Sequence, residues 1–180
     1  YRHLHDAILV GVGTVLADDP HLTTRLQHGR NPVRIILDTH LRTPQKANVV
    51  TDGQSPTWIF VSNSVAKERI IPFTAYEQVE IVQLPEAEID VHEVLHYLGQ
   101  HEITSLFVEG GASVHGSFLK AGYIQTFLCY IAPKIIGGQH AKTPIGGEGM
   151  TKIAEALKLN IKSIEKLGND MKVIATKEDN

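Results

Sequence analysis

Residues 6–14 read Asp-Ala-Ile-Leu-Val-Gly-Val-Gly-Thr, and this stretch decides the fold class. Residues 7–10 form a short continuous apolar run, which is typical of a strand buried on both faces of a sheet. The run ends at Gly11 and Gly13, and residues 14–17 fit a short turn of helix. A buried strand that passes through glycine into a helix predicts an α/β domain.

The same alternation of apolar runs and helical segments continues along the chain. Further strands are predicted over residues 33–38, 58–61, 80–84, 105–109 and 126–131. Helices are predicted over residues 64–69, 90–98, 113–120 and 151–157, with Asp90 as the N-cap of the second. This order indicates one domain built on a mostly parallel sheet.

The C-terminal part of the chain follows a different pattern. Residues 160–167 and 171–176 are two strand-like runs separated by Gly168-Asn169-Asp170, which predicts a β-hairpin. We expect this hairpin to form an antiparallel edge of the sheet. Residues 26–32 and 137–149 are predicted as exposed loops.

Composition narrows the class of protein. The chain has 180 residues, of which 42% are hydrophobic and 21% charged, as in an ordinary globular domain. The net charge of −3 disfavours non-specific nucleic-acid binding. The single cysteine, Cys129, favours a reducing compartment, the cytoplasm. No apolar run approaches the about 20 residues that span a membrane. Because the chain begins at Tyr1 without methionine, we expect it to be the remainder of a longer protein.

One candidate site follows the predicted strand over residues 105–109. Glu109 ends this strand, Gly110 and Gly111 follow it, and a helix begins near Ser113. Glycines let a ligand approach the backbone, and the free N–H groups of a helix start favour a phosphate. In open α/β sheets, ligands bind beyond the carboxyl ends of the strands. The alternative is a tight strand-to-helix turn without a ligand.

A second candidate site follows the first strand. Thr14 is placed either to cap the short helix or to bind a phosphate or sugar. Asp18 and Asp19 follow near the carboxyl end of that helix, where the helix dipole disfavours anions. They are therefore solvated, paired with a cation or used by a ligand. The alternative is a plain Asp-Asp-Pro turn, with Arg25 as a solvated loop residue.

A third motif resembles a zinc site. Residues 92–96 read His-Glu-Val-Leu-His, which matches the H-E-x-x-H pattern of zinc peptidases. The apolar stripe of the same helix (Val91, Val94, Leu95 and Leu98) faces the core, so His92 and His96 lie on the solvent side. We therefore expect an exposed polar face and no metal site.

Taken together, the motifs resemble a known family. Residues 6–20, 32–38, 108–111 and 130–138 resemble, in the same order, signature stretches of the reductase domain of the bifunctional riboflavin-biosynthesis deaminase/reductase. The resemblance extends from Arg2 to about Gly149.

This resemblance implies a fold and a reaction. The fold is a dihydrofolate-reductase-like three-layer sandwich with a mostly parallel sheet and an antiparallel C-terminal hairpin. The reaction is NADPH-dependent reduction of 5-amino-6-(5-phosphoribosylamino)uracil to its ribitylamino product. The resemblance also implies a homodimer and fusion to a preceding deaminase domain. The net charge and the short apolar runs predict no nucleic-acid or membrane partner.

The resemblance further implies which residues contact ligands. The cofactor-contacting positions are Thr14, Asp18, Thr39, Gly111, Ala112, Ser113, Val114, His115, Gly116 and Ser117. The substrate-contacting positions are Arg2, Leu22, Arg25 and Glu109. Arginines at two of these positions suit a substrate phosphate, which a guanidinium binds bidentately. Glu109 is also a candidate general acid.

One departure from the family leaves alternatives open. Family members carry another strand before the position of Tyr1, with a lysine and a hydroxyl residue facing the site, and this chain lacks it. A truncated, non-catalytic dimerisation module is therefore one alternative. A second is a relative with the same fold, either a dihydrofolate reductase or the reductase that acts on the non-deaminated diaminopyrimidine. A zinc peptidase using His92 and His96 is a third.

Overall fold

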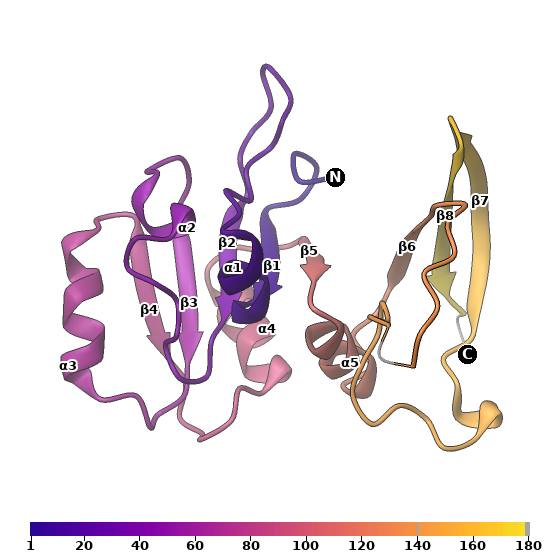
Figure 1. The fold of residues 1–180 in the computed structure, drawn as a ribbon. Helices are drawn as coiled ribbons and strands as arrows, with labels where there is room; N and C mark the ends of the chain where they lie inside the picture. Colours follow the sequence, from indigo (N-terminus) through magenta and orange to yellow (C-terminus); the bar gives the residue numbers. More distant parts are fainter. Residues whose placement is uncertain (140, 179–180) are drawn as a thin grey trace.

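Two sheets organise the chain in the computed structural model, which describes residues 1–139 and 141–178. The first sheet has five parallel strands in the order β4-β3-β2-β1-β5. The second has three antiparallel strands in the order β6-β8-β7. Helix α5 lies between the two sheets (Figure 1).

The eight strands all coincide with predicted ones to within two residues at either end. They are β1 (Ala7–Gly11), β2 (Val33–Leu37), β3 (Thr57–Val61), β4 (Val79–Gln83), β5 (Leu106–Gly110), β6 (Thr126–Ile131), β7 (Leu159–Leu167) and β8 (Asp170–Lys177). The predicted strands and the α/β class are confirmed. Short apolar runs bounded by turn residues leave the backbone little alternative to a strand.

The helices are less uniform than the strands. The described helices are α1 (Val12–Asp18), α2 (Asn48–Thr51), α3 (Lys67–Ile70), η1 (Ile71–Ala75), α4 (Val91–Gln100), α5 (Ala112–Lys120) and η2 (Ile153–Glu155). Asp90 caps α4 as predicted, because its carboxylate accepts a hydrogen bond from the His92 N–H. The helix predicted over residues 151–157 is wrong, since only the short 3₁₀ turn η2 forms there.

The parallel sheet is covered on both faces, which makes three layers. Side chains alternate along β1: Ile8 and Val10 enter one cluster, and Ala7 and Leu9 enter the other. The first cluster includes residues of α1, α2 and η1, and the second includes residues of α4 and α5. Strand β1 is completely buried, and its side chains contact both helical layers.

The C-terminal hairpin pairs in an unexpected place. Strands β7 and β8 form the predicted antiparallel hairpin, but β8 pairs with β6 rather than with the parallel sheet. Among the described residues, β5 pairs only with β1 and β6 pairs only with β8. The expected antiparallel edge is therefore a separate three-stranded sheet. In Figure 1, β5 and β6 lie at the neighbouring margins of the two sheets.

No helix in the described part of the chain is long and apolar enough to cross a membrane. The longest described helix, α4, has ten residues. The described residues of the loops 26–32 and 137–149 are mostly exposed, as predicted, and residue 140 lies outside the described part.

Candidate functional site

The candidate site lies along the carboxyl edge of the parallel sheet. Gly11 ends β1 and pairs with Leu37, which ends β2, while Val10 pairs with Gly110 at the end of β5. The three segments that follow these strands therefore start side by side. They carry Thr14, Thr39 and Gly111, so one edge brings together the three regions predicted to contact a cofactor.

The start of α5 is open to an anion. Its N-cap, Gly111, has φ of 86°, a left-handed conformation that favours glycine, and no side chain caps the helix. The first N–H groups of an α-helix have no partner within the helix. Because the helix dipole adds partial positive charge at the same place, the N–H groups at residues 112–114 have the chemistry that suits a phosphate.

Glycines bring backbone segments into close contact around this helix start. A Cβ on Gly11 would lie 2.8 Å from Val114 Cγ2, and a Cβ on Gly110 would lie 3.3 Å from Thr14 Oγ1. Thr14 lies within α1 and does not cap it, because the cap position belongs to Gly11. Its hydroxyl instead faces Gly110 across the strand ends.

Glu109 sits at an irregularity of the sheet. Leu9 pairs with Val108 and Val10 pairs with Gly110, so Glu109 has no partner in the register between β1 and β5. Bulges of this kind redirect side chains and occur often beside binding sites. Nothing in the sequence reveals this irregularity, because the register depends on both strands.

Arg2 and Glu109 form a bidentate pair. Arg2 Nε donates to Glu109 Oε2 over 2.8 Å, and Nη2 donates to Oε1 over 2.9 Å. The third arm of the guanidinium donates to the Thr23 carbonyl over 2.9 Å. The two side chains are 23% and 34% exposed, so a ligand can reach them. The pair joins the start of the chain, the loop after α1 and the end of β5.

The other two predicted substrate residues, Leu22 and Arg25, lie in different surroundings. Leu22 has φ of 54°, and its side chain is buried in the core cluster beneath α1. A ligand can therefore reach the Leu22 backbone more readily than the Leu22 side chain. Arg25 is exposed on the loop between α1 and β2. This loop projects from the top of the molecule in Figure 1.

The two aspartates after α1 have different surroundings. Asp18 is exposed at the last residue of α1. Asp19 accepts hydrogen bonds from the backbone N–H and the side chain of Asn48 at the start of α2. Asp19 is therefore occupied by a structural contact, whereas Asp18 is free to face solvent or a ligand.

A long loop returns to the site beside α5. Gly146 donates its N–H to the Ala112 carbonyl over 2.8 Å, and His115 Nδ1 lies 2.8 Å from the Pro144 carbonyl oxygen. His115 Nε2 also lies 3.3 Å from the Val108 carbonyl oxygen. Gly116 lets the loop approach, because a Cβ there would lie 2.2 Å from the Gly146 oxygen. The loop thus covers one side of α5. Ser113 and Ser117, two of the predicted cofactor positions, lie on this helix, and Gly111 is its N-cap.

Asp38, the residue directly after β2, fixes the loop that follows. Its side chain is fully buried, and Oδ2 accepts hydrogen bonds from both the N–H and the hydroxyl of Thr43 over 2.7 Å. Thr39 follows directly and is half-buried, and its carbonyl accepts a hydrogen bond from Ser62. The carboxylate therefore fixes the path of the loop that carries Thr39.

The zinc-like motif lies on α4. His92 and His96 are exposed, as predicted from the apolar stripe. His92 Nδ1 lies 2.7 Å from the Tyr123 hydroxyl, and His96 hydrogen-bonds Gln100. Within residues 1–139 and 141–178, no three His, Cys, Asp or Glu side chains are grouped to hold a metal ion.

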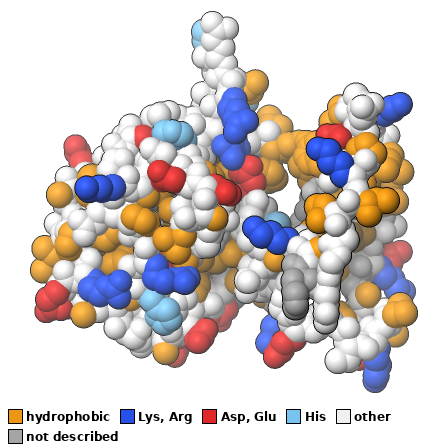
Figure 2. All heavy atoms as spheres, viewed as in Figure 1, with side chains coloured by type: hydrophobic (Ala, Val, Ile, Leu, Met, Phe, Trp, Pro, Cys, Tyr) orange, Lys and Arg blue, Asp and Glu red, His pale blue; other side chains and the backbone are white. Residues whose placement is uncertain are grey.

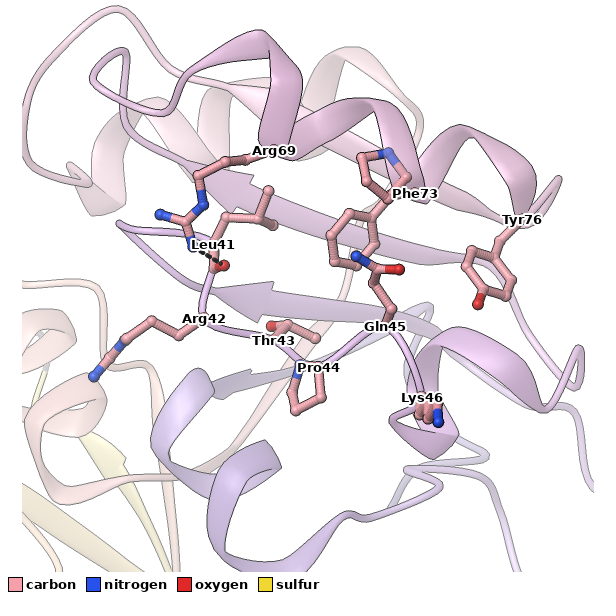
Figure 3. Close-up of a pocket in the computed structure, with 10 residues that line it drawn as sticks. Leu41, Arg42, Thr43, Pro44, Gln45, Lys46, Arg69, Phe73 and Tyr76 are labelled. Atoms are coloured by element: carbon pink, nitrogen blue, oxygen red, sulfur yellow. Dashed lines mark hydrogen bonds between the residues drawn. The ribbon is translucent and has the colours of Figure 1, made fainter.

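The sequence did not reveal a cavity of about 590 Å³ beyond the end of β2. Figure 3 shows its lining from the loop 41–46 and from α3 and η1. Three basic residues, Arg42, Lys46 and Arg69, are visible in the sequence, but their spacing does not show that they line one cavity.

Comparisons with known proteins identify the family. Residues 1–173 match the family described as the RibD C-terminal domain. The riboflavin biosynthesis protein RibD of Bacillus amyloliquefaciens is 44% identical over 99% of this chain and 48% of its own length. The 2,5-diamino-6-ribosylamino-4(3H)-pyrimidinone 5′-phosphate reductase of Methanothermobacter thermautotrophicus is 39% identical over 92% of this chain and 77% of its own length.

A solved structure supports the same assignment. The deaminase/5-amino-6-(5-phosphoribosylamino)uracil reductase of Thermotoga maritima superposes with a TM-score of 0.80 at 27% identity, covering 98% of this chain and 46% of that one. The chain spans about half the length of the RibD relatives it matches. The reductase-domain fold expected from the sequence motifs is confirmed, and the chain belongs to the RibD C-terminal domain family.

Proposed function

We propose that the chain reduces the ribosyl group of 5-amino-6-(5-phosphoribosylamino)uracil to the ribitylamino product, with NADPH as the coenzyme. The observation that carries this proposal is the shared carboxyl edge, where Thr14, Thr39 and the open start of α5 lie beside the Arg2–Glu109 pair. The relatives named as RibD and as a pyrimidinone phosphate reductase support a reduction step in riboflavin biosynthesis.

The residues present fit a dinucleotide coenzyme. The left-handed Gly111 and the uncapped N–H groups of α5 suit a pyrophosphate, and the small Gly110 leaves the Thr14 hydroxyl accessible. A bound nicotinamide coenzyme supplies the hydride. The chain itself orients the two reactants and excludes water, which is the main contribution of a protein to such a reaction.

The substrate side of the site fits a phosphorylated sugar joined to a polar ring. Arg2 and Arg25 suit the phosphate, and Glu109 suits the N–H and O–H groups of the ribose or the ring. Because Arg2 already holds both oxygens of Glu109, a substrate that takes over either partner must release the other. Binding of the phosphate and orientation of Glu109 are therefore coupled.

The experiment is a turnover measurement with two substrates. The deaminated and the non-deaminated pyrimidine are each mixed with NADPH, and the fall in absorbance of the reduced nicotinamide is followed. Faster turnover of the deaminated compound supports the proposal. Faster turnover of the diaminopyrimidine would assign the second candidate function, which the 39% identical archaeal reductase favours. Tight NADPH binding without turnover of either compound would contradict both.

We also propose that the domain includes one more strand, between β5 and β6. Each of these strands has an unpaired edge in the described part of the chain. The Tyr1 ring stacks on Phe107 with centroids 5.8 Å apart, so the start of the chain lies beside β5. A groove of about 230 Å³ involves the same strand, and apolar residues such as Leu106, Val108 and Phe118 line it together with Thr104, Tyr123 and Gln125. This mixed lining leaves room for side chains of an added strand.

We further propose a homodimer, fusion to a deaminase domain and a cytoplasmic location. Large apolar side chains stay exposed on the three-stranded sheet, which supports a covered face (Figure 2). The RibD relatives are about twice the length of this chain, which supports a further domain. The single cysteine supports a reducing compartment.

A further inference from the structure

A completely buried arginine lies in the middle strand of the parallel sheet. Arg34 is on β2, and its side chain has no exposed surface. An arginine is almost never fully buried unless it is paired. Its Nη1 donates to both carboxylate oxygens of Asp52 over 2.8 and 2.9 Å, and Nη2 donates to the Ser55 carbonyl over 2.5 Å. Asp52, directly after α2, therefore neutralises the buried charge.

The same ion pair holds His21 at two points. Arg34 Nη1 also donates to the His21 carbonyl over 3.2 Å, and the His21 ring Nδ1 lies 3.0 Å from Asp52 Oδ2. An ionised carboxylate only accepts hydrogen bonds, so the ring donates from Nδ1. The backbone and the ring of one residue are thus tied to a buried pair, although the His21 side chain itself is 52% exposed.

Asp52 is ionised within this cluster. Its side chain is 7% exposed, and burial by itself raises the pKa of a carboxyl. Hydrogen bonds from the Gln54 N–H, from His21 and from Arg34 outweigh burial and lower the pKa of Asp52 below its usual value. The carboxylate therefore stays charged at neutral pH and continues to accept from both side chains.

The segment between α1 and the predicted substrate positions has an unusual backbone. Asp19 has φ of 40° and Leu22 has φ of 54°, both in the left-handed region that residues other than glycine seldom adopt. Such conformations persist only where the surrounding contacts over-determine them. Asn48 holds Asp19 through its N–H and its side-chain amide. The Arg34–Asp52 pair holds the residue before Leu22, so the segment is fixed at both ends.

The same segment leads to the Arg2–Glu109 pair. Two residues after His21, the Thr23 carbonyl accepts a hydrogen bond from Arg2 Nη1 over 2.9 Å. The other two nitrogens of Arg2 hold the two oxygens of Glu109. The buried Arg34 and the partly exposed Arg2 thus hold alternate carbonyls of one short segment. A displacement of His21 therefore moves the Thr23 carbonyl and, with it, the guanidinium that orients Glu109.

We propose that His21 is a positioning residue for the substrate. It connects the buried Arg34–Asp52 pair, through the Thr23 carbonyl, to the guanidinium of Arg2, and it acts without touching the substrate. The proposal rests on the proposed function, which assigns the bidentate pair at the end of this series of contacts to the substrate. Loss of the His21 ring should weaken substrate binding and leave coenzyme binding unchanged.

The test uses the whole chain and removes the exposed ring rather than the buried charge. Replacing Arg34 would leave a buried carboxylate unpaired and could unfold the protein. His21→Ala deletes only the hydrogen bond to Asp52. His21→Asn is the conservative variant, because its amide can donate from nearly the position of Nδ1.

His92→Ala is the matched control. His92 is also an exposed histidine, and its Nδ1 also has one side-chain partner, the Tyr123 hydroxyl, but it lies on α4 outside this segment. For each variant, KM and kcat are measured with the pyrimidine, and the dissociation constant of NADPH is measured by fluorescence titration. Thermal unfolding checks that the fold is retained.

We expect His21→Ala to raise KM for the pyrimidine by about 3- to 10-fold, the usual effect of one lost hydrogen bond. The value of kcat and the dissociation constant of NADPH should not change. His21→Asn should recover most of the loss in affinity, and His92→Ala should show no loss.

A double variant tests the route through Arg2. In Arg2→Gln, the guanidinium that links the Thr23 carbonyl to Glu109 is already gone. Adding His21→Ala to this variant should therefore raise KM no further, because residues that act through one contact are not additive. Full additivity of the two changes would overturn the inference.

The remaining failures are distinguishable. If the unmodified protein turns over the pyrimidine and His21→Ala behaves like His92→Ala, this inference is wrong and the proposed function stands. A fall in kcat at unchanged KM, or an equal loss of affinity for the pyrimidine and NADPH, would reveal a general structural role and would also overturn it. If the unmodified protein turns over neither pyrimidine, the proposed function is wrong and the inference fails with it.

Discussion

At the scale of single residues, Asp6 connects three segments of the chain. Its Oδ2 accepts hydrogen bonds from the N–H and hydroxyl groups of Thr104 and Ser105, and Arg30 Nη2 donates to Oδ1 over 2.9 Å. Arg30 in the first place, and then Thr104 and Ser105, hold the pKa of Asp6 well below its usual range. The ionised carboxylate therefore stabilises the junction between β1 and β5.

This predicts a specific dependence of stability on pH. A carboxyl with a lowered folded pKa stabilises the protein above its unfolded pKa of about 3.9 and loses that effect as the pH falls toward the folded value. Asp6→Asn should lower the free energy of unfolding at pH 7, and the difference from the unmodified protein should shrink below about pH 4. Urea unfolding between pH 3 and pH 7 measures this difference. A difference that is constant with pH would contradict the assigned role.

A second prediction at this scale concerns Arg2. If the Arg2–Glu109 pair holds the substrate, Arg2→Gln should raise KM for the phosphorylated substrate by about 10-fold or more, since Gln offers no charge to the phosphate. The dissociation constant for NADPH should not change. Arg30→Gln removes a nearby arginine that contacts Asp6 instead, so it serves as the control. An unchanged KM in Arg2→Gln would remove Arg2 from the site.

At the scale of elements, the contact between α5 and the loop 141–149 depends on Gly116. A Cβ at this position would meet the Gly146 oxygen, so Gly116→Ala should displace the loop and destabilise the protein by about 1–3 kcal/mol. Gly99→Ala is the control, because a Cβ there meets nothing within 4 Å and alanine favours the helix α4 by up to about 1 kcal/mol. Urea unfolding of both variants checks the opposite signs, and equal effects would contradict the packing argument.

Elements are also the scale at which sequence reasoning succeeds most. The apolar runs at Ile8, Ile35 and Ile59 identify buried strands, because a run of this length ending in turn residues has few alternatives. The short helix at Asn48 was missed because four residues carry no helical period. The capping role considered for Thr14 is wrong, since α1 begins two residues earlier than expected.

The site itself could be predicted only in part. Glycines after strands mark the edge where ligands bind, so Gly111 and Thr14 can be located from the chain alone. The bidentate contact between Arg2 and Glu109 crosses 107 positions and depends on the bulge in β5, which no local pattern encodes. The cavity beyond the end of β2 depends on how the loop 41–46 packs against η1. The ligand roles of these residues stay predictions.

At the scale of the whole molecule, the separation of the two sheets predicts that a longer chain would be more stable and more active. A longer form that includes the residues before Tyr1 should pair with the open edges of β5 and β6. We expect higher thermal stability and faster turnover than for residues 1–180 alone, and protection of β5 and β6 amides in hydrogen exchange. Amides of β1, which is paired on both sides, serve as the internal reference. No change in β5 or β6 would contradict the added strand.

The three-stranded sheet leads to a prediction about association. Ile161 and Ile164 on β7 are 63% and 59% exposed, which is unusual for two apolar side chains on one strand. Ile164→Glu should shift the protein from dimer to monomer, as measured by sedimentation velocity at several concentrations. Lys162→Glu, on the same strand, changes charge without removing apolar surface and should leave the dimer largely intact. A monomer at all concentrations for the unmodified chain would contradict the proposed dimer.

The pairing of β1 with β5 has a consequence for the order in which the candidate site forms during folding. Ala7 pairs with Leu106, so this ladder closes a loop of about a hundred residues, whereas β1 and β2 are only 26 positions apart. Closing the longer loop costs more chain entropy, and contacts between distant residues slow folding. We expect β1 to β4 to assemble first and β5 to join last. Glu109 and Gly111 arrive with β5, so the binding edge matures in the final step of folding.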